Sequence, residues 1–353
     1  MKIISLVGAR PQFIKEAIVH RELKSAGITE VLVNSGQHYD ANMADVFFQD
    51  LEIKAPDYNL GVGSASHAEM TGKIIIEFEK IALKEKPDYV LVYGDTNTTL
   101  AGAIVASKLK VPVAHVEAGV RMFPKDMPEE INRTLTDRVS KLLFCSSMKC
   151  VENLSSEGIR QGVHFTGDVM YDLFLLLKPK FKYECNERYD LKPNSYAVLT
   201  LHRDYNVDNK ERLEEILTNI ACFAKEVAVI FPIHPRTRKR ITEFGLEAHL
   251  KDITVLEPLD YLNLMGLVSN SQLIITDSGG LQKEAYYADK PALLFMDDPA
   301  WHELVEEGVN RLVGDTSLIQ LTKSLHRKEL SRNIYGTGTA SKEIVRILKD
   351  QSK

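Results

Sequence analysis

Short apolar runs alternate along this chain with longer stretches in which apolar residues recur every three or four positions. In the first half, the runs cover residues 3–7, 31–34, 89–93, 112–116 and 142–145, and helical patterns such as 13–25 and 67–84 lie between them. Regular alternation of strand and helix predicts a mostly parallel sheet with helices on both faces. The chain is therefore expected to have an α/β fold.

The alternation stops in a charged segment and then begins again. Residues 179–195 contain two prolines and show little periodicity, which is typical of an interdomain linker. Beyond it, apolar runs at 196–201, 227–231, 253–256, 273–275 and 292–295 predict a second doubly wound sheet. We therefore expect domains at 1–178 and 196–334, and a C-terminal helix within 335–353 that packs back across the junction. Such a pair of domains is expected to bind its ligand in the cleft between them.

Composition excludes several classes of protein. The chain has 353 residues, which is long for one hydrophobic core and agrees with two domains. Its net charge of −5 argues against a nucleic-acid partner. No apolar run approaches the ~20 residues of a membrane span, and the N-terminus lacks a signal-peptide pattern. We therefore expect no membrane partner. The four cysteines and the histidines show no zinc-like spacing, so no metal site is expected. Cysteines without a pairing pattern indicate a reducing compartment, so we expect a cytoplasmic location.

The segment Thr276-Asp277-Ser278-Gly279-Gly280 joins an apolar run to a helical pattern. Backbone N–H groups are free at such a helix start, and glycines let a ligand approach the main chain, so the segment predicts a phosphate site. Glu284 lies one helical turn beyond Gly280, where a carboxylate can accept hydrogen bonds from ribose hydroxyls. Together these residues predict a nucleoside diphosphate ligand. The alternative is an ordinary turn that Ser278 caps.

Charged residues also follow the runs at 3–7 and 89–93. Arg10 comes directly after the first run and Lys15 lies one turn into the next helix. They are expected either to bind a phosphate or a sugar, or simply to lie in water. Asp95 follows the second run. It is expected either to cap the next helix, the commoner role there, or to face the cleft as an acid or base.

Three carboxylates form the sharpest pattern in the first half. Glu117 comes straight after the run at 112–116, and Glu129 and Glu130 stand in a proline-led helix start, where the macrodipole favours acidic residues without any function. Asp95, Glu117 and Glu129 converging on one cleft would have separated pKa values and supply both an acid and a base. Glu130 replaces Glu129 in this set if the helix presents it instead.

Two histidines end strands of the second half. His202 is followed by Arg203 and is placed either to hydrogen-bond a phosphate or to lie in a surface loop, and His234 repeats the theme one strand later. The chain lacks a dinucleotide fingerprint, a P-loop and a Gly-x-Ser-x-Gly elbow. These absences disfavour an NAD enzyme, a kinase and a serine hydrolase of that fold.

Over essentially its whole length the chain resembles the non-hydrolysing UDP-N-acetylglucosamine 2-epimerase family. The matching segments are Gly8-Ala9-Arg10-Pro11 with Lys15, Ser35-Gly36-Gln37-His38, Gly94-Asp95-Thr96, His115-Val116-Glu117-Ala118-Gly119, Pro128-Glu129-Glu130-Ile131-Asn132-Arg133, Thr200-Leu201-His202-Arg203 and Thr276-Asp277-Ser278-Gly279-Gly280. Each segment is short, but their order and spacing are specific. The resemblance implies GT-B architecture, with two Rossmann-like domains and the active site in the interdomain cleft.

The resemblance also implies a reaction, in which UDP-GlcNAc is inverted at C2 to UDP-ManNAc. UDP is eliminated across C1–C2 to give a 2-acetamidoglucal and is then re-added, with no redox cofactor and no obligatory metal. Domain closure would keep water from the glycal. Relatives are often dimers, so a homodimer is expected, and the pathway implied is polysaccharide biosynthesis. The resemblance carries over Asp95, Glu117, Glu129 and His202 as the catalytic set, and Arg10, Lys15, Arg133, His234, Ser278, Gly279, Gly280 and Glu284 as the substrate- and UDP-binding set.

One segment departs from the common family pattern. Where most members carry Arg-Pro-Glu, this chain has Trp301-His302-Glu303. This resembles the subgroup that acts on modified sugars such as UDP-2,3-diacetamido-2,3-dideoxyglucuronic acid, and the alternative is that Trp301 simply packs at the domain seam. A GT-B glycosyltransferase, a hydrolysing epimerase and a nucleotide-sugar sensor are further alternatives. The carboxylates argue against the glycosyltransferase, because elimination needs more acid and base groups than simple transfer.

Overall fold

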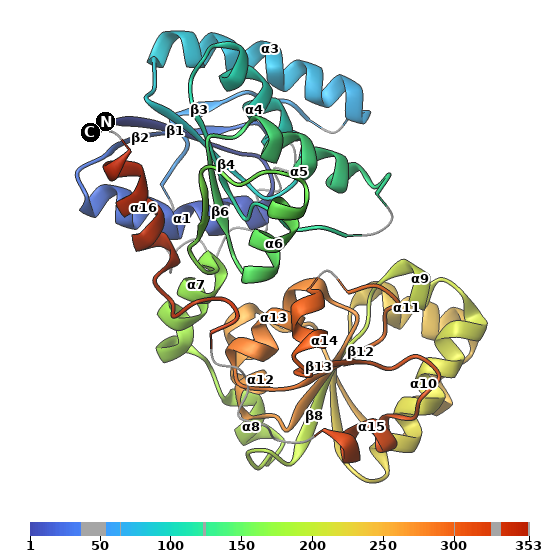
Figure 1. Cartoon of the computed structure of the whole chain (residues 1–353). Coiled ribbons are helices and arrows are strands. Elements are labelled where there is room, and N and C mark those ends of the chain that lie inside the picture. Colours follow the sequence, from blue (N-terminus) through green and yellow to red (C-terminus); the bar gives the residue numbers. More distant parts are fainter. Residues whose placement is uncertain (37–53, 64, 123–124, 300, 326–332, 352–353) are drawn as a thin grey trace. The chain divides into compact units, whose positions relative to one another are not determined.

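The computed structural model describes residues 1–36, 54–63, 65–122, 125–299, 301–325 and 333–351 (Figure 1). Of the residues in the family-like segments, Gln37 and His38 lie outside these ranges. The chain forms two compact units, one made of Met1–Leu175 with Asn333–Lys353 and the other of Leu176–Arg332. Each unit is built around one parallel sheet, which confirms the predicted α/β class.

The first unit holds a 7-stranded sheet in the order β3-β2-β1-β4-β5-β6-β7. Its strands are β1 (Lys2–Val7), β2 (Thr29–Asn34), β3 (Tyr58–Asn59), β4 (Tyr89–Tyr93), β5 (Val113–Val116), β6 (Leu142–Cys145) and β7 (Val163–Phe165). Every pairing is parallel, for example Leu6 with Val92 and Tyr93 with Val116. The carboxyl ends of β1, β4 and β5 therefore lie next to one another at one edge of the sheet.

Helices cover both faces of this sheet because its strands are apolar on both sides. They are α1 (Arg10–Ser25), α3 (His67–Glu85), α4 (Asn97–Lys108), α5 (Pro128–Val139), α6 (Met148–Ser156), α7 (Val169–Leu177) and α16 (Ala340–Asp350). Successive side chains of a strand point to opposite faces. Ile3 and Val7 thus join a core with α1 and α16, whereas Ile4 and Leu6 join another with α3 and α4. Figure 1 shows α1 and α16 side by side.

The second unit holds a 6-stranded parallel sheet in the order β10-β9-β8-β11-β12-β13. Its strands are β8 (Tyr196–Thr200), β9 (Ala228–Pro232), β10 (Ile253–Leu256), β11 (Leu273–Thr276), β12 (Ala292–Leu294) and β13 (Asn310–Leu312). The helices are α8 (Glu184–Arg188), α9 (Asp204–Val207), α10 (Lys210–Ala224), α11 (Pro235–Phe244), α12 (Tyr261–Asn270), α13 (Gly279–Tyr287), α14 (His302–Glu306) and α15 (Leu318–Ser324), with 3-10 turns η2 (Lys178–Lys180) and η3 (Glu247–Leu250). Among the helices of the described residues, none has the length and apolar character needed to cross a membrane.

Each apolar run singled out in the sequence forms a strand, with bounds that differ by at most two residues. Three edge strands, β3, β7 and β13, are only two or three residues long and have no such signal, whereas the edge strand β10 matches the run at 253–256. The segment 179–195 carries most of η2 and all of α8, and it belongs to the second unit. The last helix, α16, packs against α1 and completes a core of the first unit.

Candidate active site

The first unit brings Lys15 and Glu117 together at the carboxyl ends of β1 and β5. The Lys15 ammonium forms an ion pair with the Glu117 carboxylate, and both side chains are largely buried. Glu117 has a φ of 71°, a left-handed conformation that non-glycine residues rarely adopt and that costs of order 1–3 kcal/mol. Strain of this kind is concentrated at functional sites, and here it turns a carboxylate toward Lys15 directly after a buried strand.

Gln12 fixes the start of α1 between two strand ends. Its amide oxygen accepts hydrogen bonds from the backbone of Gly8 and Ala9 at 2.8 and 3.0 Å, and its amide nitrogen donates to the Tyr93 carbonyl at 2.7 Å. It is 2% exposed, so α1 is held rigidly against β4. Sequence reasoning missed this residue, although a polar side chain three residues into a helix is a recognisable capping signal.

Asp95 does not cap the helix that follows it. The N-cap of α4 is Thr96, whose side chain accepts from the Thr99 backbone, so the predicted capping role of Asp95 is wrong. The Asp95 carboxylate instead forms an ion pair with Arg133 of α5. Arg133 also donates to the buried Glu130 at 2.8 Å. Asp95, Arg133 and Glu130 thus form one chain of charges that links β4 to α5.

Glu129 and Arg10 are both exposed, unlike the buried or partly buried residues of these ion pairs. Glu129 is exposed in the first turn of α5, and within the described residues no hydrogen bond or ion pair joins it to Asp95 or Glu117. Its neighbour Glu130 is the residue that faces inward and also accepts from the Met122 backbone at 3.0 Å. Arg10 is exposed at the first residue of α1. We call Lys15, Asp95, Glu117, Glu130 and Arg133 the carboxylate cluster.

A buried histidine, His115, connects Asp137 of α5 to the turn that precedes Asp95. The Nδ1 and Nε2 atoms of His115 lie 2.7 Å from the Asp137 carboxylate and from the Gly94 carbonyl, which belongs to the turn before Asp95. Burial alone would raise the pKa of Asp137, but the hydrogen bond from His115 and the charge of Arg121 hold that pKa below its ordinary value. Asp137 therefore stays ionised and keeps the β4–α4 turn in place.

In the second unit, Asp277 organises the strand ends of β8 and β11. It is fully buried and accepts hydrogen bonds from the backbone N–H groups of His202 and Arg203 and from the Asn206 amide. The His202 Nδ1 atom lies 3.3 Å from the same carboxylate. Burial lowers the pKa of His202 against the opposing charge of Asp277, so the ring tends to be neutral. This role of Asp277 is not predicted from the sequence, because it depends on donors just after β8 and in α9 that only the folded chain brings together.

Ser278, Gly279 and Gly280 begin α13, as the sequence indicates. The Ser278 side chain accepts from the Leu281 backbone at 3.4 Å, which is the capping contact of an ordinary turn. A Cβ atom built on Gly279 or Gly280 would meet no atom closer than 3.8 Å. The main chain of the first turn is therefore open to a ligand, and a capped turn and a phosphate site are compatible here.

His234 takes a local role within the second unit. Its Nδ1 atom accepts from the Arg236 backbone at 3.2 Å and caps α11. The His202 and His234 rings lie with their centroids 5.8 Å apart, so the two histidines are neighbours at the ends of β8 and β9. Arg236 and Arg240 pair with Asp208, in agreement with a solvated helix face.

Trp301 packs against the first turn of α13. The indole Nε1 donates to the Gly279 carbonyl at 2.8 Å, and the Lys283 ammonium lies 3.7 Å from the ring centroid. Trp301 is only 8% exposed. The residue that stands in place of the family arginine therefore contacts the same turn as the glycines. We call His202, Asp277, Ser278, Gly279, Gly280, Glu284 and Trp301 the α13 cluster.

Glu284 gives the α13 cluster a pH-sensitive group. Burial raises the pKa of Glu284 to about 7, although the Tyr261 hydroxyl and Lys283 oppose the shift. Its contribution to the free energy of unfolding is therefore fully present below its unfolded pKa near 4.5 and is lost as pH rises through about 7. We expect Glu284→Gln to gain stability relative to the wild type between pH 5 and pH 8, measured as the difference in melting temperature. The same change at the exposed Glu226 should show no such trend.

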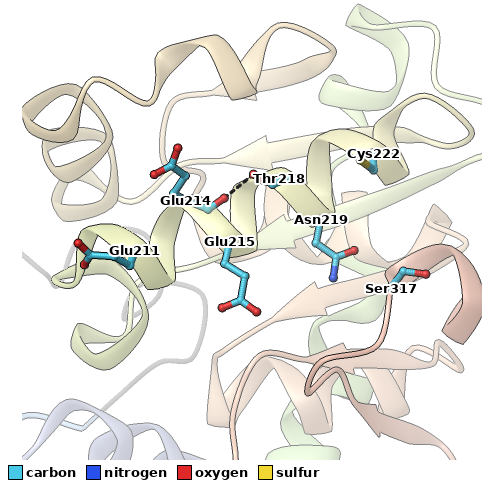
Figure 2. Close-up of a pocket in the computed structure, with 7 residues that line it drawn as sticks. All are labelled: Glu211, Glu214, Glu215, Thr218, Asn219, Cys222 and Ser317. Atoms are coloured by element: carbon cyan, nitrogen blue, oxygen red, sulfur yellow. Dashed lines mark hydrogen bonds between the residues drawn. The ribbon is translucent and has the colours of Figure 1, made fainter.

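A separate hollow lies in the second unit, beside α10. It is lined by Glu211, Glu214, Glu215, Thr218, Asn219, Cys222 and Ser317, and Figure 2 shows that most of these side chains come from one face of α10. Its glutamates would repel an anionic nucleotide. Asn219 holds Leu318 and Thr316 through hydrogen bonds, which is a structural role. The hollow is therefore not the candidate site.

Comparison with known proteins gives consistent matches along the chain. A family model described as UDP-N-acetylglucosamine 2-epimerase matches residues 21–349. The chain is 45% identical over 364 residues to the UDP-N-acetylglucosamine 2-epimerase of Methanocaldococcus jannaschii, covering 99% of each protein. It is 42% identical over 358 residues to the UDP-2,3-diacetamido-2,3-dideoxy-D-glucuronate 2-epimerase of Pseudomonas aeruginosa, again covering 99% of each.

Solved structures agree. The crystal structure of the M. jannaschii protein in complex with UDP-GlcNAc and UDP matches with a TM-score of 0.83 and 44% identity, covering 99% of this chain and 100% of that one. The matching structures are of the GT-B type, which confirms the predicted fold.

Proposed function

Because the chain belongs to the UDP-N-acetylglucosamine 2-epimerase family, we propose that it inverts C2 of UDP-GlcNAc to give UDP-ManNAc. The observation that carries the proposal is the placement of Asp95 and Glu117 at the carboxyl ends of neighbouring strands, each ion-paired to a cation. Two carboxylates at the ends of neighbouring strands are what a reaction with one proton removal and one proton return requires. Family membership sets aside the glycosyltransferase alternative.

In the proposed reaction, one carboxylate accepts the C2 proton while the C1–O bond breaks and its electron pair leaves with UDP. A C1=C2 double bond forms, giving the 2-acetamidoglucal. An acid on the opposite face then returns a proton to C2, while a UDP oxygen re-forms the bond to C1. We assign these two roles to Asp95 and Glu117, whose orientations are held by Arg133 and Lys15.

The other proposed roles follow from where the side chains lie. Glu130 positions Arg133, whereas Glu129 and Arg10, both exposed, are proposed to contact substrate. The diphosphate is proposed to bind at the first turn of α13, where backbone N–H groups and the macrodipole stabilise the departing UDP. His202 would donate a hydrogen bond to the diphosphate, and His234 would lie beside the diphosphate. Glu284 would accept from the ribose.

A proton NMR time course in D2O with UDP-GlcNAc tests the proposal. The expected result is a new UDP-ManNAc anomeric signal with deuterium at C2, because the proton returned to C2 comes from solvent-exchanged carboxyl groups. Free ManNAc and UDP would identify the hydrolysing reaction instead. Absence of any change with UDP-GlcNAc would contradict the assignment of this substrate.

A second substrate is supported by Trp301 and by the P. aeruginosa relative. That relative is named for UDP-2,3-diacetamido-2,3-dideoxy-D-glucuronate, and this chain is 42% identical to it. The same NMR experiment with that nucleotide sugar separates the two candidates by the ratio of kcat/KM values. A ratio that favours the diacetamido uronate would replace UDP-GlcNAc as the proposed substrate.

Trp301 offers a test of the proposed UDP site. Trp301→Phe keeps an aromatic ring beside Lys283 but removes the donor to the Gly279 carbonyl, a contact worth about 1 kcal/mol. We expect UDP affinity to fall about fivefold, with kcat little changed, because the first turn of α13 loses its anchor. Calorimetric titration with UDP measures this. Unaltered affinity would show that Trp301 merely packs.

A further inference from the structure

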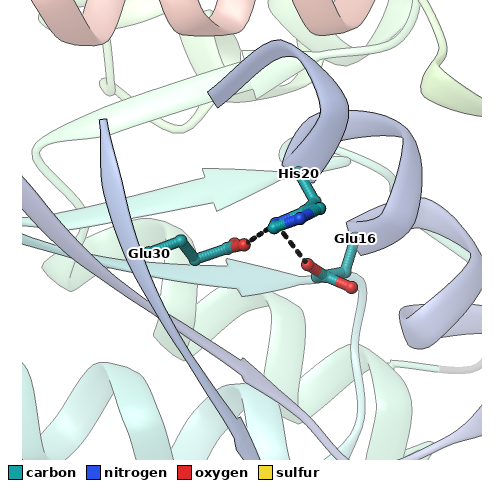
Figure 3. Close-up of side chains that lie close together, drawn as sticks. All are labelled: Glu16, His20 and Glu30. Carbon is teal, nitrogen blue, oxygen red and sulfur yellow. Dashed lines mark hydrogen bonds and ion pairs between the residues drawn. The ribbon is translucent and has the colours of Figure 1, made fainter. Parts of the chain in front are cut away.

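A cluster of ionisable side chains lies between α1 and β2, apart from the carboxylate and α13 clusters. Glu16 and His20 are one helical turn apart on α1, and Glu30 is in β2. One potential ligand atom from each lies within 4.8 Å of the others. Figure 3 shows the His20 ring between the two carboxylates. Its Nδ1 atom contacts Glu30 and is 3.9 Å from Glu16 Oε1.

The carboxylate of Glu16 is buried without a hydrogen-bond partner. Glu16 is 0% exposed, and among the described residues neither of its oxygen atoms accepts a hydrogen bond. Burying an ionised carboxylate in this way is costly unless a cation or donor compensates it. Glu30, by contrast, accepts from the Ser5 hydroxyl and contacts His20.

The nearby ammonium group does not bind Glu16 directly. Lys54 donates to the Glu30 carbonyl at 2.8 Å and to the Asp57 carboxylate at 2.6 Å. Two buried carboxylates and one imidazole nitrogen thus converge on one point, with the Glu16 oxygen atoms unsatisfied by any described residue.

We propose that Glu16, His20 and Glu30 bind a divalent first-row transition-metal ion, with Zn²⁺ as the representative. One imidazole nitrogen and two carboxylate oxygens are a ligand set that Zn²⁺ accepts, with water completing the coordination. A charge of +2 balances both carboxylates and satisfies the free oxygen atoms of Glu16. His20 has a side chain 18% exposed, which gives the ion and its water a route from solvent.

Such an ion would cross-link α1 to β2 within the first unit. Glu16 and His20 lie on the same helix as Gln12 and Lys15, so the ion would stiffen the support of the carboxylate cluster without touching substrate. The inference does not depend on the proposed epimerase activity. Its sequence signal is the i, i+4 spacing of Glu16 and His20, which carries little information without Glu30 from another element.

The test uses tag-free full-length protein freed of metal with a chelator. Calorimetric titration with Zn²⁺ is expected to show one ion per chain, and the melting temperature should rise with Zn²⁺ and fall again with EDTA. Co²⁺ in its place should give the visible absorption bands of an ion held by nitrogen and oxygen ligands. If the wild-type chain binds no Zn²⁺ and no Co²⁺, the proposal is overturned.

Variants locate the ion. Glu16→Gln and His20→Gln are expected to lower Zn²⁺ affinity at least tenfold, since even outer partners of a metal ligand are worth about 10- to 100-fold. Glu22→Gln, on the same helix but outside the cluster, should bind like the wild type. Undiminished binding by both cluster variants would show an adventitious surface ion and would also overturn the proposal. If a variant fails to fold, the wild-type stoichiometry and Co²⁺ spectrum decide.

Discussion

Asp95→Asn is expected to lower turnover of the UDP-sugar by about 10²- to 10⁴-fold, the usual share of a general acid or base. Asparagine keeps an oxygen for Arg133 but can neither accept nor return a proton at C2. UDP affinity should change less than about threefold, because Asp95 belongs to the carboxylate cluster and not to the α13 cluster. Steady-state kinetics and calorimetric titration with UDP measure the two effects separately.

Two companion variants sharpen this test. Glu117→Gln should cause a similar loss, and the two variants should differ in which step they block if the carboxylates act on opposite faces of C2. One variant should still release UDP and glycal from UDP-GlcNAc without forming the epimer, and the other should release neither. The exposed Asp126→Asn is the control and should retain full activity. An Asp95→Asn enzyme with more than a tenth of wild-type turnover would remove Asp95 from the acid and base pair.

Asp277→Ala is expected to cost about 3 kcal/mol or more in the free energy of unfolding of the second unit and to abolish measurable UDP binding. The change leaves the backbone N–H groups of His202 and Arg203 and the Asn206 amide without an acceptor, and unsatisfied buried donors cost about 1–3 kcal/mol each. The turn that presents His202 then has nothing to hold it. Urea unfolding and UDP titration measure the two effects.

The exposed Asp252→Ala controls for loss of an aspartate from the same unit and should leave both quantities unchanged. Asp277→Asn should be intermediate, because one amide oxygen still accepts while the amide nitrogen brings a donor beside other donors. UDP binding by Asp277→Ala at wild-type affinity would refute the organising role given to this residue.

Much of the fold is predictable because buried parallel strands are continuous apolar runs. Residues 89–93 and 142–145 illustrate this, and their bounds match β4 and β6. Some edge strands are different, although the edge strand β10 matches its predicted run at 253–256. β3 is only Tyr58–Asn59, and β13 is Asn310–Leu312, so each depends on one neighbouring strand and not on a pattern of its own. Local sequence cannot reveal an element that tertiary pairing creates.

The site is predictable to the level of a segment and less so to the level of a side chain. Strand-end position brought out Asp95 and Glu117, and the structure pairs both with cations. Helical phase decided between the two adjacent glutamates of α5, since Glu130 points inward and Glu129 does not. The role of Asp277 cannot be predicted from the sequence. It depends on the number of N–H donors that bond to this carboxylate, which only the folded chain shows.

The placement of α16 has a consequence for how the protein is made. Ile344, Ile347 and Leu348 belong to the same core as Ile3 and Val19. The first unit therefore lacks part of its hydrophobic core until α16 emerges from the ribosome. The second unit is continuous from Leu176 to Arg332 and can close in the interval. At translation rates of about 5–20 residues per second, that interval lasts roughly 10 to 30 s. The first unit is thus begun first but completed last, after the whole second unit has been synthesised.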